Sequence, residues 1–84
     1  MTNKTAEIIL LIIKNINEGD GSSLKMINSS LNILLRNEEY QILFNNEFNL
    51  NSMINDLIKL KYITINTINN YELTELGNKQ LKIK

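Results

Sequence analysis

The chain of 84 residues contains no cysteine and no histidine. Without cysteine it has no disulfide bridge, no thiolate nucleophile and no cysteine-ligated metal site. Without histidine it lacks the side chain that most often serves as a general base in enzymes and as a metal ligand in proteins. These two absences exclude the commonest catalytic and metal centres. We therefore expect no enzyme activity, no metal site and no cofactor.

Proline is also absent and no low-complexity linker interrupts the chain, so we expect a single domain over residues 1–84. A domain of this size has a small core, and association with a second subunit can supply the missing burial. Nine basic residues balance nine acidic ones, so the overall charge does not indicate nucleic-acid binding. The apolar run at residues 8–13 is too short for a membrane span, which needs about 20 residues. No cleavage site for a signal peptide lies near it, so we expect a cytoplasmic protein without membrane contact.

The first expected helix, residues 5–17, has apolar side chains around its whole circumference. Such a helix needs burial on more than one side. In a chain this small, one side can face the core and the other a partner subunit. An alternative is a central helix buried within the monomer, and a β-strand over the apolar run fits less well because the helical spacing continues. The residues expected at a dimer interface are Ile8, Ile9, Leu11, Ile12 and Ile16.

The rest of the chain predicts further helices and a β-hairpin, which makes the fold class α+β, mostly α. Ser22 or Ser23 can cap the second helix, Asn49 or Asn51 the fourth, and Thr74 the last. The third and fourth helices, with the turn at residues 47–49, form a candidate helix-turn-helix. The expected elements are helices at 24–36, from 37–39 to 45 or 46, and from 49–51 to 60, then strands at about 62–65 and 71–73, and a helix to residue 81.

Residues 49–81 resemble the second half of a winged-helix domain. NSMINDLIKLKYITI and NYELTELGNKQL together show a helix ending in a leucine-rich turn, an aliphatic strand, a wing, and a Tyr-x-Leu-Thr-x-x-Gly run into the last helix. The matching residues are Leu57, Ile63, Tyr71, Leu73, Thr74 and Gly77. The resemblance implies a winged helix-turn-helix with a C-terminal β-hairpin wing and a terminal helix, and it implies binding to double-stranded DNA.

The resemblance implies that the fourth helix enters the major groove of DNA and that the hairpin contacts the DNA backbone or the minor groove. The groove admits one helix, and asparagine can pair with adenine. Ser52, Asn55 and Lys59 are spaced to line one exposed stripe, and the first amides of the helix can meet a phosphate. The alternative is a polar solvent face, because asparagine occurs throughout the chain. The residues expected at DNA are Asn49, Asn51, Ser52, Asn55, Lys59, Lys61, Asn66, Thr67, Asn69, Asn70 and Lys79.

Several residues depart from the winged-helix pattern. Lys61 stands where many members have glycine, so it must accept the geometry that ends the helix, or the helix ends differently. The single arginine, Arg36, lies outside the fourth helix and the hairpin, while Glu47 and Asp56 would repel phosphates. The tip of the hairpin, residues 66–70, carries no charge. A basic excess toward the C-terminus comes from Lys59, Lys61, Lys79, Lys82 and Lys84.

Few cations per subunit imply little counterion release and a weak contact with DNA. Useful affinity then requires a dimer on repeated half-sites, or several dimers side by side. We expect a homodimer that binds double-stranded DNA sequence-specifically, at AT-rich repeats, as a transcriptional regulator or as a partition adaptor that binds repeated sites cooperatively. The chain is similar to the winged-helix centromere-binding adaptors of tubulin-like plasmid and phage partition systems, which implies a filament-forming GTPase as partner. The alternative is a winged-helix protein–protein interaction module that does not bind DNA.

Overall fold

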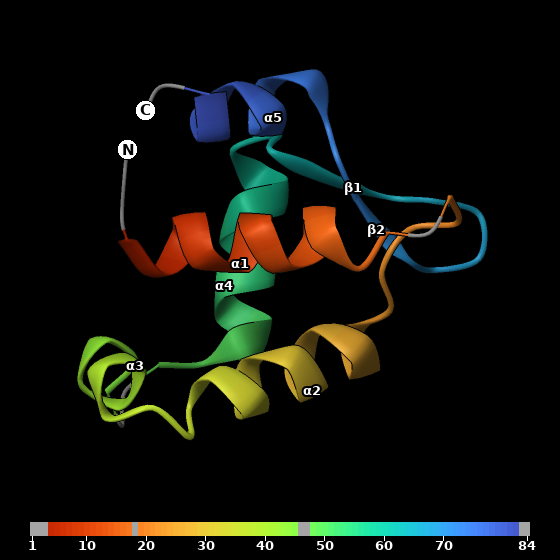
Figure 1. Cartoon of the computed structure of the whole chain (residues 1–84). Helices are drawn as coiled ribbons and strands as arrows, with labels where there is room; N and C mark the ends of the chain where they lie inside the picture. The colour runs from red at the N-terminus through yellow and green to blue at the C-terminus, as the bar shows by residue number, and fades with distance from the viewer. Residues whose placement is uncertain (1–3, 18, 46–47, 83–84) are drawn as a thin grey trace.

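A computed structural model describes residues 4–17, 19–45 and 48–82. Its elements follow the expected order, with most ends shifted by one or two residues, and they confirm a mostly helical α+β fold that contains an antiparallel hairpin (Figure 1). In the part that the structure describes, no helix is both long and apolar enough to cross a membrane. The elements are α1 (Lys4–Asn15), α2 (Leu24–Leu34), α3 (Glu38–Leu43), α4 (Leu50–Lys59), β1 (Ile63–Ile65), β2 (Tyr71–Leu73) and α5 (Glu75–Lys82).

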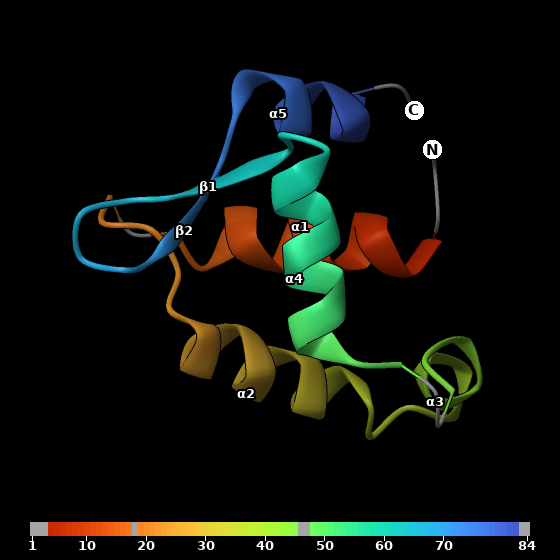
Figure 2. The same cartoon turned by 180° about the vertical axis from the view of Figure 1, so that it is seen from behind.

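Helix α1 lies at the centre of the fold. It contacts α2, α5 and β2, and α4 crosses behind it (Figures 1 and 2). Because neighbours cover it on several sides, Ile9, Leu10 and Ile13 are at most 1% exposed. The apolar circumference of α1 therefore has an explanation within one chain, which is the alternative that the sequence left open.

This burial changes which residues of α1 can contact a partner. Ile9 is fully buried in the single chain, and Ile8 and Ile12 keep only 8% and 7% of their surface. Ile9 therefore belongs to the monomer's own core, whereas Ile8 and Ile12 still line a hollow at the surface of α1, and the dimer interface expected on this helix stays a prediction. Leu11 remains 41% exposed and Ile16 is half-buried, so these two residues of the expected set still reach the surface.

Helix α4 packs its apolar side into the same core and leaves its opposite side to solvent. Ile54 and Leu57 are buried, whereas Asn51, Asn55 and Lys59 are exposed. The segment between α3 and α4 is held by aromatic side chains. Phe44, at the end of α3, packs edge-on against Phe48, before α4, with ring centroids 4.8 Å apart. Residues 46 and 47, between these two rings, lie outside the described part of the chain.

The hairpin is joined to the segment before α2 by a pairing that the sequence did not indicate. Ser22 and Tyr71 exchange two backbone hydrogen bonds of 2.8 Å. The Ser22 hydroxyl also donates to the carbonyl oxygen of Ile13, at 2.8 Å, and the residue is fully buried. Ser22 thus ties α1, α2 and β2 together, while Ser23 caps α2 by accepting the N–H of Met26.

In the connection from α4 to β1, Lys61 takes the first of its two expected alternatives and accepts the helix-ending geometry. This residue has a φ of 65°, in the left-handed region that glycine adopts most readily. Its carbonyl accepts a hydrogen bond from the Thr74 hydroxyl, and that hydroxyl also accepts the N–H of Gly77, at 3.0 Å. Thr74 therefore caps α5, as expected, and fixes α5 to the end of α4.

Candidate nucleic-acid interface

The outward side of α4 brings four of the expected DNA-contacting residues into one stripe. Asn51, Ser52, Asn55 and Lys59 are all exposed on this ten-residue helix, and no other helix lies in front of α4 in the view from behind (Figure 2). Asp56 is exposed on the same helix and places a negative charge among them. The stripe therefore offers amide and hydroxyl groups for hydrogen bonding and one cation for a phosphate.

Asn49 has a structural role at the start of the stripe. Its side-chain oxygen accepts the N–H of Ser52 at 3.0 Å, which makes it the N-cap of α4. The Ser52 amide is therefore occupied by the cap in this conformation, and the expected contact of the first amides of the helix with a phosphate stays a prediction. The exposed amide nitrogen of Asn49 can still donate.

A hollow of about 540 Å³ lies where α2 approaches the start of α4. Lys25 and Asn28 reach it from α2, and both are exposed. The sequence did not indicate these two residues, because the winged-helix resemblance on which the expected site depends covers only residues 49–81. The available signal was the spacing of three between them, which places both on one side of α2. Lys25 adds a second cation to the end of the stripe opposite Lys59. The hollow is lined by Leu24, Lys25, Asn28, Phe48, Asn49, Leu50 and Asn51.

The hairpin tip is organised by Asn66, whose side chain uses its full hydrogen-bonding capacity. Its oxygen accepts the N–H groups of Ile68 and Asn70, both at 3.0 Å. Its nitrogen donates to the carbonyl of Asp20 and to the carboxylate of Glu72, both at 2.7 Å. The Asn66 amide is thus fully engaged in this conformation, and the expected contact of Asn66 with DNA stays a prediction.

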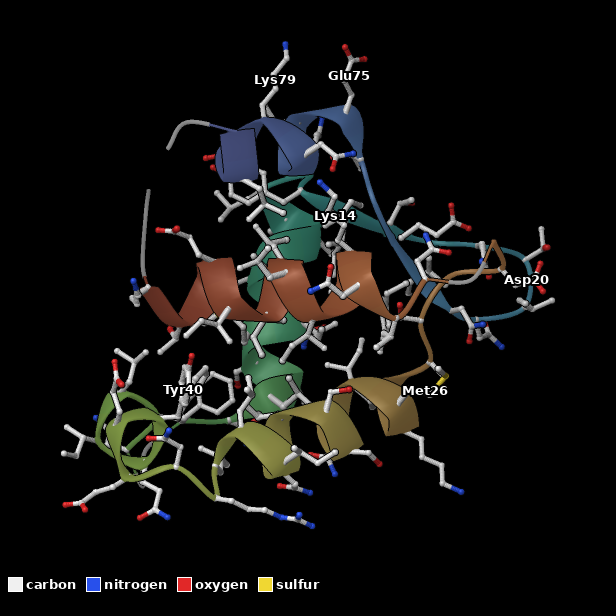
Figure 3. The ribbon with its side chains drawn as sticks, viewed as in Figure 1. Lys14, Asp20, Met26, Tyr40, Glu75 and Lys79 are labelled. Atoms are coloured by element: carbon white, nitrogen blue, oxygen red, sulfur yellow. The ribbon has the colours of Figure 1, made fainter. Side chains whose placement is uncertain are left out.

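Asn70 is also engaged, since its amide donates to the Asp20 carbonyl at 3.0 Å. The two asparagines thus anchor the hairpin to the loop before α2, where Asp20 lies beside it (Figure 3). The residues left exposed at the tip are Thr67, Ile68 and Asn69. Ile68 is 57% exposed and Ile65 on β1 is 49% exposed, so much of the exposed hairpin surface is apolar.

The lysines expected at DNA fall into two places. Lys59 and Lys61 are exposed at the C-terminal end of α4. Lys79 lies on α5 and points away from the body of the molecule, beside Glu75 (Figure 3). α5 lies at the end of α4 that is remote from the hollow (Figure 2), so Lys79 does not extend the stripe toward Lys25. Lys84 and the side chain of Lys82, together with Glu47, lie outside the described part of the chain.

Nothing in the described residues resembles a metal centre: no three acidic, histidine or cysteine side chains gather there. No protein-family model, curated protein or solved structure matches the chain.

Proposed function

We propose that the protein is a winged-helix protein that binds double-stranded DNA sequence-specifically, with α4 in the major groove. The observation that carries this proposal is the α4 stripe, which is exposed, polar and backed by a buried apolar side. A single helix fits the major groove of B-DNA, where asparagine can donate to and accept from adenine. Asn51 and Asn55, exposed one turn apart, are the residues that would read bases.

Lysines near both ends of α4 would position the helix on the DNA backbone. Lys25 lies at the hollow by the start of the helix, and Lys59 and Lys61 lie at its end. Lysines spaced along a recognition helix fix its orientation through phosphates and carry no sequence information. The exposed hairpin tip, with Thr67 and Asn69, would be an accessory contact, because the side chain of Asn66 is committed to the hairpin itself.

Three lysines per subunit make a weak grip. Each neutralised phosphate contributes about −0.9 to the slope of log K against log salt, so one subunit would give a slope of about −2.7. We therefore infer that several subunits act together on repeated sites, in a transcriptional regulator or in a partition adaptor that recruits a filament-forming GTPase.

The second candidate is a protein–protein interaction module, favoured by the apolar exposed hairpin. Ile65 and Ile68 would contact a protein surface more favourably than a phosphate backbone. The two functions differ in the role of α4. For DNA binding the stripe is essential, whereas for the module it would be dispensable.

Substitutions in the stripe separate the two candidates. Asn55→Ala should weaken binding to the preferred duplex by about 1–3 kcal/mol and relax its sequence preference, since a base contact is lost. Asn32→Ala, an exposed asparagine on α2 that does not line the hollow, is the matched control and should bind as the native protein does. Fluorescence anisotropy with the preferred duplex measures the DNA affinity of both variants and of the native protein. Equal binding by Asn55→Ala and the native protein would contradict the assignment of α4.

A further inference from the structure

An apolar surface that the proposed DNA contact does not use covers α1, α2 and α3; we call it the α1–α3 face. Three large side chains project from it, one from each helix: Leu11, Ile33 and Ile42 are 41%, 59% and 73% exposed. They stand beside two hollows of about 380 and 400 Å³ that share Ile8, Leu11 and Tyr40. Tyr40 lies between α3 and α1 (Figure 3), so the two hollows belong to one surface.

We propose that this face docks a second copy of the same chain, in a symmetric dimer. Its charge pattern favours that occupant. The first hollow is lined without a single acidic or basic residue, and the second is lined by Lys4, Glu7 and Glu39 as well as by apolar residues. Protein interfaces combine an uncharged apolar part with a polar part. A strongly acidic or basic partner would find no matching field, whereas a copy of this chain brings the same uncharged hollow and the same charges of both signs.

A symmetric dimer sets a requirement on the shape of the α1–α3 face. A two-fold axis makes the same patch contact itself, so each projecting group must find a hollow on the partner. Here Leu11 and Ile33 line the first hollow, and Ile42 lines the second. The exposed side chains and both hollows therefore lie on one surface, which offers a symmetric partner both kinds of feature.

A stable interface buries about 800 Å² on each partner, which is about a seventh of the 5683 Å² accessible surface of this chain. Burial of Leu11, Ile33 and Ile42 would also remove the most exposed apolar group of each helix from water, and this is the main driving force for association.

The location of the face keeps both functions compatible. Helix α1 separates the α1–α3 face from α4 (Figures 1 and 2). In the proposed dimer, the α4 stripe of each subunit would therefore lie away from the interface and stay exposed. The proposed dimer does not depend on DNA binding, because it is defined by apolar surface alone. It also extends the interface expected from the sequence, because Ile33 on α2 and Ile42 on α3 join the residues of α1 that line the hollows.

Sedimentation equilibrium of the purified chain without DNA tests the proposal. The native protein should reach about twice its 9.7 kDa chain mass in the micromolar range. Ile33→Glu should raise the dissociation constant of the dimer at least tenfold, because a buried unpaired carboxylate opposes association. Leu11→Glu should act in the same direction. Ile68→Glu, at an equally exposed isoleucine on the hairpin, is the control and should dimerise like the native chain.

Two results would overturn the proposal: a native chain that stays monomeric throughout that range, or an Ile33→Glu variant that dimerises as tightly as the native chain. Circular dichroism would establish that each variant is folded, which we expect because all three sites are exposed. Failure of the DNA proposal would look different, since Asn55→Ala and the native chain would then bind duplex equally while the dimer remained sensitive to Ile33→Glu.

Discussion

Replacing Gly77 with alanine tests how α5 is held against the connection between α4 and β1. Gly77 is buried in α5, and a Cβ added there would lie 2.9 Å from the Tyr62 carbonyl carbon and nearer still to its oxygen. Carbon atoms pack comfortably at about 3.5–4.0 Å, so α5 would have to move away by about 1 Å or more. The same Tyr62 carbonyl accepts the N–H of Thr74 at 2.9 Å, so this movement would strain the bonds that cap α5.

The net effect of Gly77→Ala is the difference between a local gain and a larger loss. Alanine favours a helix over glycine by about 1 kcal/mol. Overpacking costs about 1–3 kcal/mol or more, and each weakened hydrogen bond of Thr74 adds about 1 kcal/mol. We expect a net loss of about 2–3 kcal/mol in the free energy of unfolding, equivalent to a fall in Tm of about 10–20 °C.

Urea unfolding followed by circular dichroism measures this loss as a lower midpoint with an unchanged slope. Lys79→Ala, at an exposed site on the same helix, is the control and should stay within about 0.5 kcal/mol of the native protein. If Gly77→Ala were as stable as the native chain or more stable, as alanine would be in an uncrowded helix, the close packing of α5 on Tyr62 would be refuted.

Two further substitutions test the turns around the hairpin. Lys61→Gly should raise the free energy of unfolding by about 0.5–1 kcal/mol, because a left-handed conformation costs a lysine about 1–2 kcal/mol and glycine loses part of this gain through its flexible unfolded state. A destabilised Lys61→Gly variant in urea unfolding would contradict the positive φ. Asn66→Ala should lower the free energy of unfolding by about 2 kcal/mol, because four hydrogen bonds are lost: two within the hairpin tip, one to Glu72 on β2 and one to Asp20 in the loop before α2. Thr67→Ala, at the exposed neighbouring site, is its control, and equal stability of the two variants would contradict the role of Asn66.

The local features of the fold were predictable because each depends on residues close together in the sequence. Asn49 and Thr74 cap helices by bonding to amides three residues ahead, a pattern that sequence spacing reveals. The strain at Lys61 followed from the helix end that precedes a strand. The α+β class followed in the same way from the order of periodic segments.

The remaining features depend on residues that are distant in the sequence. The side chain of Asn66 donates a hydrogen bond to the carbonyl of Asp20, 46 positions earlier, and no local sequence pattern predicts such a contact. The pairing of Ser22 with Tyr71 involves a single residue on one side, which is too short for a periodic signal. For α1, an apolar circumference indicated burial but could not distinguish the core of the monomer from a partner. Lys25 joined the candidate site only because α2 approaches the start of α4.

The central proposal, that α4 grips duplex DNA, is tested most directly by the salt dependence of binding. A labelled AT-rich duplex would be titrated with the native protein by fluorescence anisotropy over a series of salt concentrations. We predict binding at low salt and a slope of log K against log salt of about −2.7 when one subunit is engaged, doubling to about −5.4 when two are engaged, because each subunit offers Lys25, Lys59 and Lys61 to phosphates. Absence of binding at low salt, or binding with a slope near zero, would contradict it.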